Sequence, residues 1–133
     1  MKYLSPLFFA CLFFAGCGGD SLQLGYVSGT VTLDGKPVPA GVVVTFVPQF
    51  PNSSPSTGIT DANGHYEANF SFSRKGVMVG EHGVSFSLVD SDEKKPDIKL
   101  PAKYLDSYEG KREPMLREVK KGKQKIDFDL LSK

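Results

Sequence analysis

The chain of 133 residues lacks tryptophan, has only two cysteines and carries a formal net charge of only +1. Two cysteines cannot form a multi-disulfide scaffold, and no Cys/His cluster has the spacing of a zinc site. The small charge excludes a strongly basic nucleic-acid binder, while 40% hydrophobic and 23% charged residues argue against wholesale disorder. No segment has the pattern of a long amphipathic helix. The composition therefore indicates one ordinary folded domain and names no activity.

The N-terminus has the pattern of an export signal. One cation, Lys2, precedes an apolar stretch over residues 3–15, which is shorter than the roughly 20 apolar residues that span a bilayer. Residues 14–17, Phe-Ala-Gly-Cys, resemble a bacterial lipobox. In that motif the peptide is cut before the cysteine, whose thiol receives a diacylglycerol and whose amino group usually receives a fatty acyl chain such as palmitate. The resemblance implies that Cys17 is the lipidation site.

This resemblance sets the expected domain organisation and localisation. Residues 1–16 are expected to be a cleaved lipoprotein signal peptide, and residues 17–25 the lipidated cysteine and a short tether. Gly18 stands where Asp would resemble an inner-membrane retention signal, which favours the outer membrane or periplasm over the inner membrane. The alternatives are an ordinary signal peptide cut near Gly18 and an uncleaved anchor.

After the tether, apolar and polar residues alternate with period two, which predicts β-strands with one buried side. Further strands are predicted over residues 42–47 and 56–60, and a hairpin is predicted to turn at Lys121-Gly122. About seven short strands, with at most two helical turns over residues 102–109, predict an all-β, antiparallel sandwich. The predicted inward positions are Val27, Gly29, Val31 and Leu33; Tyr66, Ala68, Phe70 and Phe72; Val84, Phe86 and Leu88; and Ile126, Phe128 and Leu130.

Several Gly-containing motifs occur in one order along this region. They are Val-Ser-Gly-Thr-Val at residues 27–31, Gly-Lys-Pro-Val at 35–38, Ala-Gly-Val-Val-Val at 40–44, Thr-Asp-Ala-Asn-Gly-His-Tyr at 60–66 and Gly-Val-Met-Val-Gly-Glu-His at 76–82. Together they resemble the carboxypeptidase regulatory-like, transthyretin-type domain of small bacterial lipoproteins. The resemblance implies an immunoglobulin-like or prealbumin-like β-sandwich over residues 26–133, and it implies no enzyme, because this module is an accessory beside the catalytic domain in carboxypeptidases.

The candidate metal ligands are few. Asp61 and Asn63 superficially resemble part of a calcium loop, but the third ligand, the distant Glu and the flanking helices of an EF-hand are missing. We predict instead a turn in which the Asp61 carboxylate accepts hydrogen bonds from backbone amides. His65 and His82 would form a transition-metal site only if they converged with a carboxylate, and we expect both to be exposed and unpaired. No cofactor is expected.

Sugar binding and catalysis have weak support. No Gly-x-Ser-x-Gly motif occurs, and no catalytic residue is assigned. Exposed aromatic rings could stack on a sugar or a protein partner, or they could pack against the ends of the sandwich. The loop aromatics are Phe50, Tyr104 and Tyr108, whereas the strand phase assigns Tyr66, Phe70, Phe72, Phe86 and Phe128 to the core.

Charge is unevenly distributed along the chain. Residues 17–93 carry three cations and eight acids, whereas residues 94–133 carry twelve cations and seven acids. The basic part is interpreted either as a face for anionic lipid or cell-wall polymer or as a solvated strand face. The sequence predicts a non-catalytic envelope lipoprotein that acts as a structural or protein-interaction module, with loops 49–56 and 101–114 as contact surfaces. The alternative is a ligand-binding module for a cell-surface glycan or a divalent cation; no nucleic-acid partner is expected.

Overall fold

The computed structural model describes residues 23–90, 95–106 and 115–133, and this part of the chain contains β-strands and one 3₁₀ turn but no α-helix. The predicted signal peptide and Cys17 lie outside the described residues. The elements are β1 (Leu24–Leu33), β2 (Lys36–Pro37), β3 (Val42–Pro48), β4 (Ser56–Ile59), β5 (His65–Glu67), β6 (Asn69–Ser71), β7 (Arg74–Lys75), β8 (Val77–Met78), β9 (Gly80–Leu88), η1 (Ala102–Tyr104), β10 (Met115–Val119), β11 (Gly122–Lys125) and β12 (Phe128–Leu130).

The first sheet is built around the ten-residue strand β1. On one side, β11 pairs with its first half and β12 with its second half, both in the parallel direction. On the other side, β8, β5 and β2 pair with successive stretches of β1 in the antiparallel direction. Every strand of this sheet therefore depends on β1 for its backbone hydrogen bonds.

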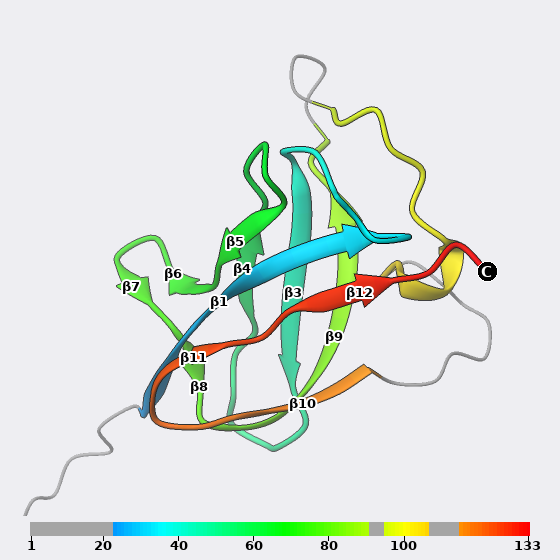
Figure 1. Ribbon diagram of the computed structural model, residues 1–133. Coiled ribbons are helices and arrows are strands. Elements are labelled where there is room, and N and C mark those ends of the chain that lie inside the picture. The colour runs from blue at the N-terminus through cyan, green and yellow to red at the C-terminus, as the bar shows by residue number, and fades with distance from the viewer. Residues whose placement is uncertain (1–22, 91–94, 107–114) are drawn as a thin grey trace, which may run out of the picture.

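The second sheet is antiparallel and has the strand order β10-β9-β3-β4-β6-β7. In Figure 1, β1 and β12 run across the front of β3, β4 and β9. Side chains of both sheets meet in a single buried cluster between them. The predicted all-β class and two-sheet packing are confirmed at this level.

The predicted antiparallel pairing holds for the second sheet and for β2, β5 and β8 in the first, whereas β11 and β12 run parallel to β1. The predicted C-terminal hairpin is wrong. The turn at Lys121-Gly122 connects β10, which pairs with β9, to β11, which pairs with β1, so the chain passes from one sheet to the other. Gly122 has φ +90°, a backbone conformation that glycine adopts without strain. The chain can therefore turn sharply here, whether it forms a hairpin or crosses to the other sheet. Turn residues specify where the chain reverses, but they do not specify the strand with which the next segment pairs. That partner is β1, because its edge is free and because pairing there buries the residues that follow.

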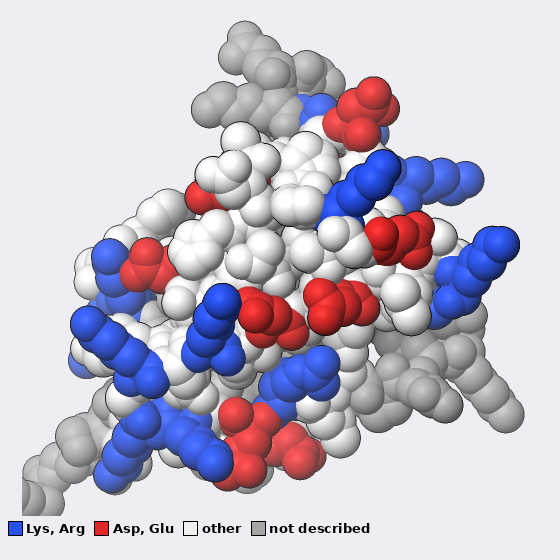
Figure 2. Space-filling view, viewed as in Figure 1, with Lys and Arg blue, Asp and Glu red and all other residues white. Residues whose placement is uncertain are grey.

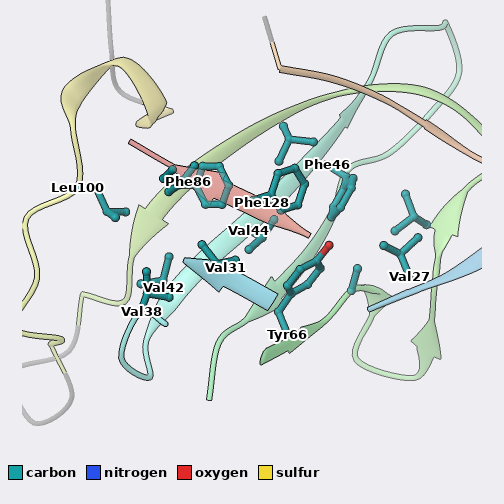
Figure 3. Packing of buried hydrophobic residues seen from close by; sticks show 14 of the residues in the cluster. Val27, Val31, Val38, Val42, Val44, Phe46, Tyr66, Phe86, Leu100 and Phe128 are labelled. Carbon is teal, nitrogen blue, oxygen red and sulfur yellow. The ribbon is translucent and has the colours of Figure 1, made fainter. Parts of the chain in front are cut away.

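Four aromatic rings form the centre of the core and join the two sheets (Figure 3). Tyr66 and Phe128 come from the first sheet, and Phe46 and Phe86 come from the second. The Phe128 ring centroid lies 5.4 Å from that of Phe86, 6.0 Å from that of Tyr66 and 6.1 Å from that of Phe46. All four side chains are at most 1% exposed, as the alternation of the sequence predicts for Tyr66, Phe86 and Phe128.

The inward assignment is wrong for Phe72, which is fully exposed, and holds only partly for Phe70, which is half-buried. The strand β6 ends at Ser71, and the chain then turns so that β7 pairs back onto β6. Alternation between faces stops where a strand stops, so an apolar residue at the next odd position no longer faces the core.

The break between β11 and β12 is held by side chains of the first sheet. Gly29 lies against this break: a Cβ atom there would lie 1.9 Å from the Ile126 carbonyl oxygen. The Tyr66 hydroxyl donates a hydrogen bond to the same carbonyl, and the Asp127 carboxylate accepts one from the Thr30 amide at 2.8 Å. These contacts fix the point at which the C-terminal segment leaves and rejoins β1.

We predict that Tyr66→Ala lowers the free energy of unfolding by about 3–5 kcal/mol, because it leaves a cavity in the aromatic cluster and unpairs the Ile126 carbonyl. Tyr66→Phe should cost about 1–2 kcal/mol, since it removes only the hydrogen bond. Tyr26→Ala is the matched control at a 53% exposed tyrosine. Urea unfolding of the three variants measures these effects, and equal stability of Tyr66→Ala and wild type would contradict the packing.

Candidate functional site

A groove of about 430 Å³ lies on the outer face of the first sheet. The outward side chains of β1, β5 and β11 line it, because residues that alternate with the core positions point to this face. The groove residues that carry polar groups are Tyr26, Ser28, His65, Glu67, Lys75, Lys123 and Gln124.

The groove combines an exposed aromatic ring with cations. Tyr26 lies directly opposite Lys123 in the register of β1 and β11 and is 53% exposed. Lys75 forms an exposed ion pair with Glu67, with 3.2 Å between Nζ and Oε1, and such a pair contributes at most about 1 kcal/mol. An aromatic face beside an ammonium group suits a sugar ring or an anionic group, and these residues include no activated nucleophile.

The loop at Asp61 is a turn, as the sequence predicts. The Asp61 Oδ1 atom accepts hydrogen bonds from the backbone amides of Asn63 at 2.8 Å and His65 at 3.0 Å. Gly64 adopts φ +75° and donates its amide to the Asp61 carbonyl. One carboxylate oxygen of Asp61 therefore serves the turn. Within residues 23–90, 95–106 and 115–133, no group of three His, Cys, Asp or Glu side chains could hold a metal ion.

The two histidines do not converge. His65 lies on β5 of the first sheet and is exposed, as predicted. His82 lies on β9 of the second sheet, and its prediction as an exposed residue is wrong, because its side chain is 0% exposed. Along β9, the alternate side chains of His82, Val84 and Phe86 point inward. The histidine therefore occupies the core position that the alternation of this strand assigns to it.

His82 is buried among aromatic rings with half of its hydrogen-bonding capacity unused. Its Nδ1 atom lies 3.0 Å from the Gly80 carbonyl oxygen, and its Nε2 atom has no partner. The rings of Phe46 and Phe50 pack edge-to-face against it, with centroids at 6.2 and 5.7 Å. Burial lowers the pKa of His82, and the carbonyl of Gly80 offsets part of that effect. Arg117 on β10 lies opposite His82 in the register of the two strands.

A buried serine, Ser56, also has a hydroxyl group without a partner. It lies on β4, whereas His82 lies on β9, and β3 separates the two strands. Two strand spacings amount to about 9–10 Å, which is too far for the hydrogen bond of a Ser–His pair. The phenyl ring of Phe46, which is opposite Ser56 in register, lies on the same inner face.

The loop aromatics that the structure describes pack against the body. Phe50 contacts His82, and Tyr104 packs edge-to-face on Phe86 with the centroids 6.4 Å apart. The Tyr104 hydroxyl accepts a hydrogen bond from the Leu131 amide at 3.1 Å. Tyr108 lies outside the described residues.

Tyr26 is the exposed aromatic residue of the groove, and the sequence reasoning passed over it. Its signal was present, because an inward Val27 places the preceding residue on the outer face of the same strand. Lys75 and Lys123 carried no comparable signal, since only the tertiary structure brings β7 and β11 beside β1.

Comparison with known proteins adds no relative: no family model, no curated protein and no solved structure matches this chain. Among the residues that the structure describes, no helix is long and apolar enough to cross a membrane.

We predict that the protein loses stability as the pH falls below about 6.5. The pKa of His82 is lowered in the folded state, so the unfolded chain binds a proton at a higher pH and stability is lost down to the folded-state pKa. The slope is at most about 1.4 kcal/mol per pH unit. Thermal unfolding between pH 7.5 and 5 measures it.

The matched variants are His82→Leu and His65→Ala. The first should flatten the pH dependence in this range, because it removes the buried titrating group, and the second is the control substitution at an exposed histidine of the other sheet. An equally steep pH dependence in His82→Leu would assign the effect to other groups.

Proposed function

We propose that this protein is a bacterial envelope lipoprotein, anchored through acylated Cys17, whose β-body serves without catalysis as a structural or protein-interaction module. The observation that carries the proposal is the lipobox-like segment at residues 14–17, a few residues before the first strand. Two or three acyl chains hold a protein on a membrane far more stably than one, since each buried CH₂ contributes about 0.8 kcal/mol.

The start of β1 supports this geometry. The Gln23 carbonyl accepts a hydrogen bond from the Val79 amide at 3.0 Å, and Leu24 pairs with Met78. The chain is therefore held from Gln23 onward, and the segment from Cys17 to Leu24 spans at most about 25 Å. A lipid on Cys17 would keep the body close to the bilayer.

The arrangement of polar groups supports a non-catalytic role. Asp61 serves a turn, His82 is enclosed by rings, and His65 lies on the other sheet. The proposed contact surface includes the loop over residues 49–56, most of whose residues are exposed or half-buried. We further propose that the two-sheet body is a carboxypeptidase regulatory-like sandwich of the immunoglobulin-like or prealbumin-like type, which the ordered Gly motifs support. The outer membrane or periplasm is the favoured location.

We predict that Cys17→Ala releases the protein from the membrane fraction of a bacterial host, because position 17 of the lipobox then has no thiol for acylation. The matched control is Cys11→Ala, which changes the other cysteine and should leave the protein in the pellet. Intact-mass measurement of the wild type should give residues 17–133 plus a diacylglyceryl group, with a further fatty acyl chain where the amino group is acylated. A Cys17→Ala protein that pellets as the wild type does, or a mature mass without an acyl increment, would contradict the anchor.

A second candidate function, binding of a cell-surface glycan, is favoured by the groove beside Tyr26. Titration calorimetry of the processed protein in detergent against envelope polysaccharides separates the two. If the groove binds sugar, we expect saturable heat that Tyr26→Ala abolishes and Tyr104→Phe leaves intact, because Tyr104 packs on the core. If the protein has only the non-catalytic interaction role, neither the wild type nor Tyr26→Ala should give saturable heat.

A further inference from the structure

A cationic turn lies beside the strand that carries the proposed tether. The turn, defined here by Lys120, Lys121 and Lys123, joins β10 to β11, and all three side chains are exposed. In register, Gly122 pairs with Gly25 and Lys123 with Tyr26, one and two residues after the start of β1. Figure 2 shows lysine and arginine side chains gathered at the lower left of the molecule, where Figure 1 places the start of β1.

The turn is rigidly placed. The side-chain amide of Gln124 accepts a hydrogen bond from the Lys120 amide at 3.0 Å and donates to the Lys120 carbonyl. Gly25 allows the close approach, because a Cβ atom there would lie 2.1 Å from the Lys120 carbonyl oxygen. Gly122 supplies the positive φ of the turn. The three ammonium groups therefore remain on one short, fixed segment next to the point where the chain enters the fold.

The adjoining strands also carry acidic side chains. Glu81 and Glu118 are exposed and face each other in the register of β9 and β10, on the outer face of the second sheet. Two neighbouring lysines are already paired: Lys75 of the groove with Glu67 at 3.2 Å, and Lys125 at the end of β11 with Asp127 at 3.7 Å. No salt bridge within the described residues involves the three lysines of the cationic turn.

We propose that the cationic turn docks the body onto the anionic phospholipid headgroups of the membrane to which the protein is anchored. This inference rests on the proposed anchor at Cys17. A tether of at most about 25 Å makes docking an intramolecular event, so weak electrostatic contacts suffice to set the orientation. Each lysine near an anionic surface favours the docked state roughly fivefold, and the effect is screened within about 8 Å at physiological salt.

Docking at this end would leave the other end of β1 free. Lys36 pairs with Leu33, about 25 Å along β1 from Gly25, and Lys133 follows Ser132, whose amide binds Asp34. Lys103 lies on η1 next to Tyr104, whose hydroxyl accepts a hydrogen bond from the Leu131 amide. These three exposed lysines therefore carry the same charge at the opposite end and serve as internal controls.

The test is an amine-labelling footprint of the processed, full-length lipoprotein in vesicles of phosphatidylcholine, with and without phosphatidylglycerol. We expect labelling of Lys120, Lys121 and Lys123 to slow at least fivefold with phosphatidylglycerol and to recover at high salt. Labelling of the control lysines should not change. Equal labelling of the cationic turn in both vesicles would overturn the proposal, as would protection by a soluble acidic polysaccharide but not by phosphatidylglycerol.

Two variants distinguish docking from a general charge effect. In the wild type, phosphatidylglycerol should also slow labelling of Lys125, which lies two residues beyond the turn on β11. Replacing all three lysines of the cationic turn by glutamine should abolish this protection of Lys125, whereas glutamine at Lys36, Lys103 and Lys133 should preserve it. Loss of protection in both variants would overturn the assignment to this turn. Flotation reports the anchor separately: a lipidated protein floats with both kinds of vesicle, and an unlipidated one floats with neither, because the electrostatic contact alone is weak.

Discussion

The contact of the Phe128 ring with three other rings is the interaction on which the arrangement of the two sheets depends. Phe46 and Phe86 reach it from the second sheet and Tyr66 from the first, and the guanidinium of Arg117 lies 5.2 Å from its centroid. Rings that interlock across two sheets fix their separation and rotation, because close-packed interiors tolerate little sliding. The outer face of each sheet is thereby fixed as well, including the one that carries the groove.

The same contact explains the unusual path of the C-terminal segment. Burial of Phe128 requires β12 to lie on the first sheet, although β10 belongs to the second. The chain crosses at Gly122 and meets β1 in parallel, and Gly29 leaves the room in which the Ile126 carbonyl approaches the strand. Because of this crossing, the lysines of the connecting segment lie beside the start of β1. The same chain path therefore buries Phe128 and positions the cationic turn.

Much of the fold follows from local patterns, and the errors have identifiable physical origins. The alternation along β1 and along residues 84–88 of β9 predicts their buried faces, and the Asp61 turn follows from the tendency of Asp to bind nearby amides. Phe72 is misassigned because nothing local indicates that β6 ends at Ser71. His82 is misassigned because a polar residue near the start of a strand is expected at the surface, whereas the alternation of β9 places it in the core with Val84 and Phe86.

The sequence by itself determined the all-β class, the strand faces and the lipobox resemblance at Cys17, because these depend on neighbours within a few residues. Tertiary structure alone decided that β11 and β12 run parallel to β1, and that Tyr26 and Lys123 share a groove. Those two residues lie almost a hundred positions apart in the chain. Strand pairing over such distances is selected by which arrangement buries the most apolar surface and satisfies the backbone, and no short segment carries that information.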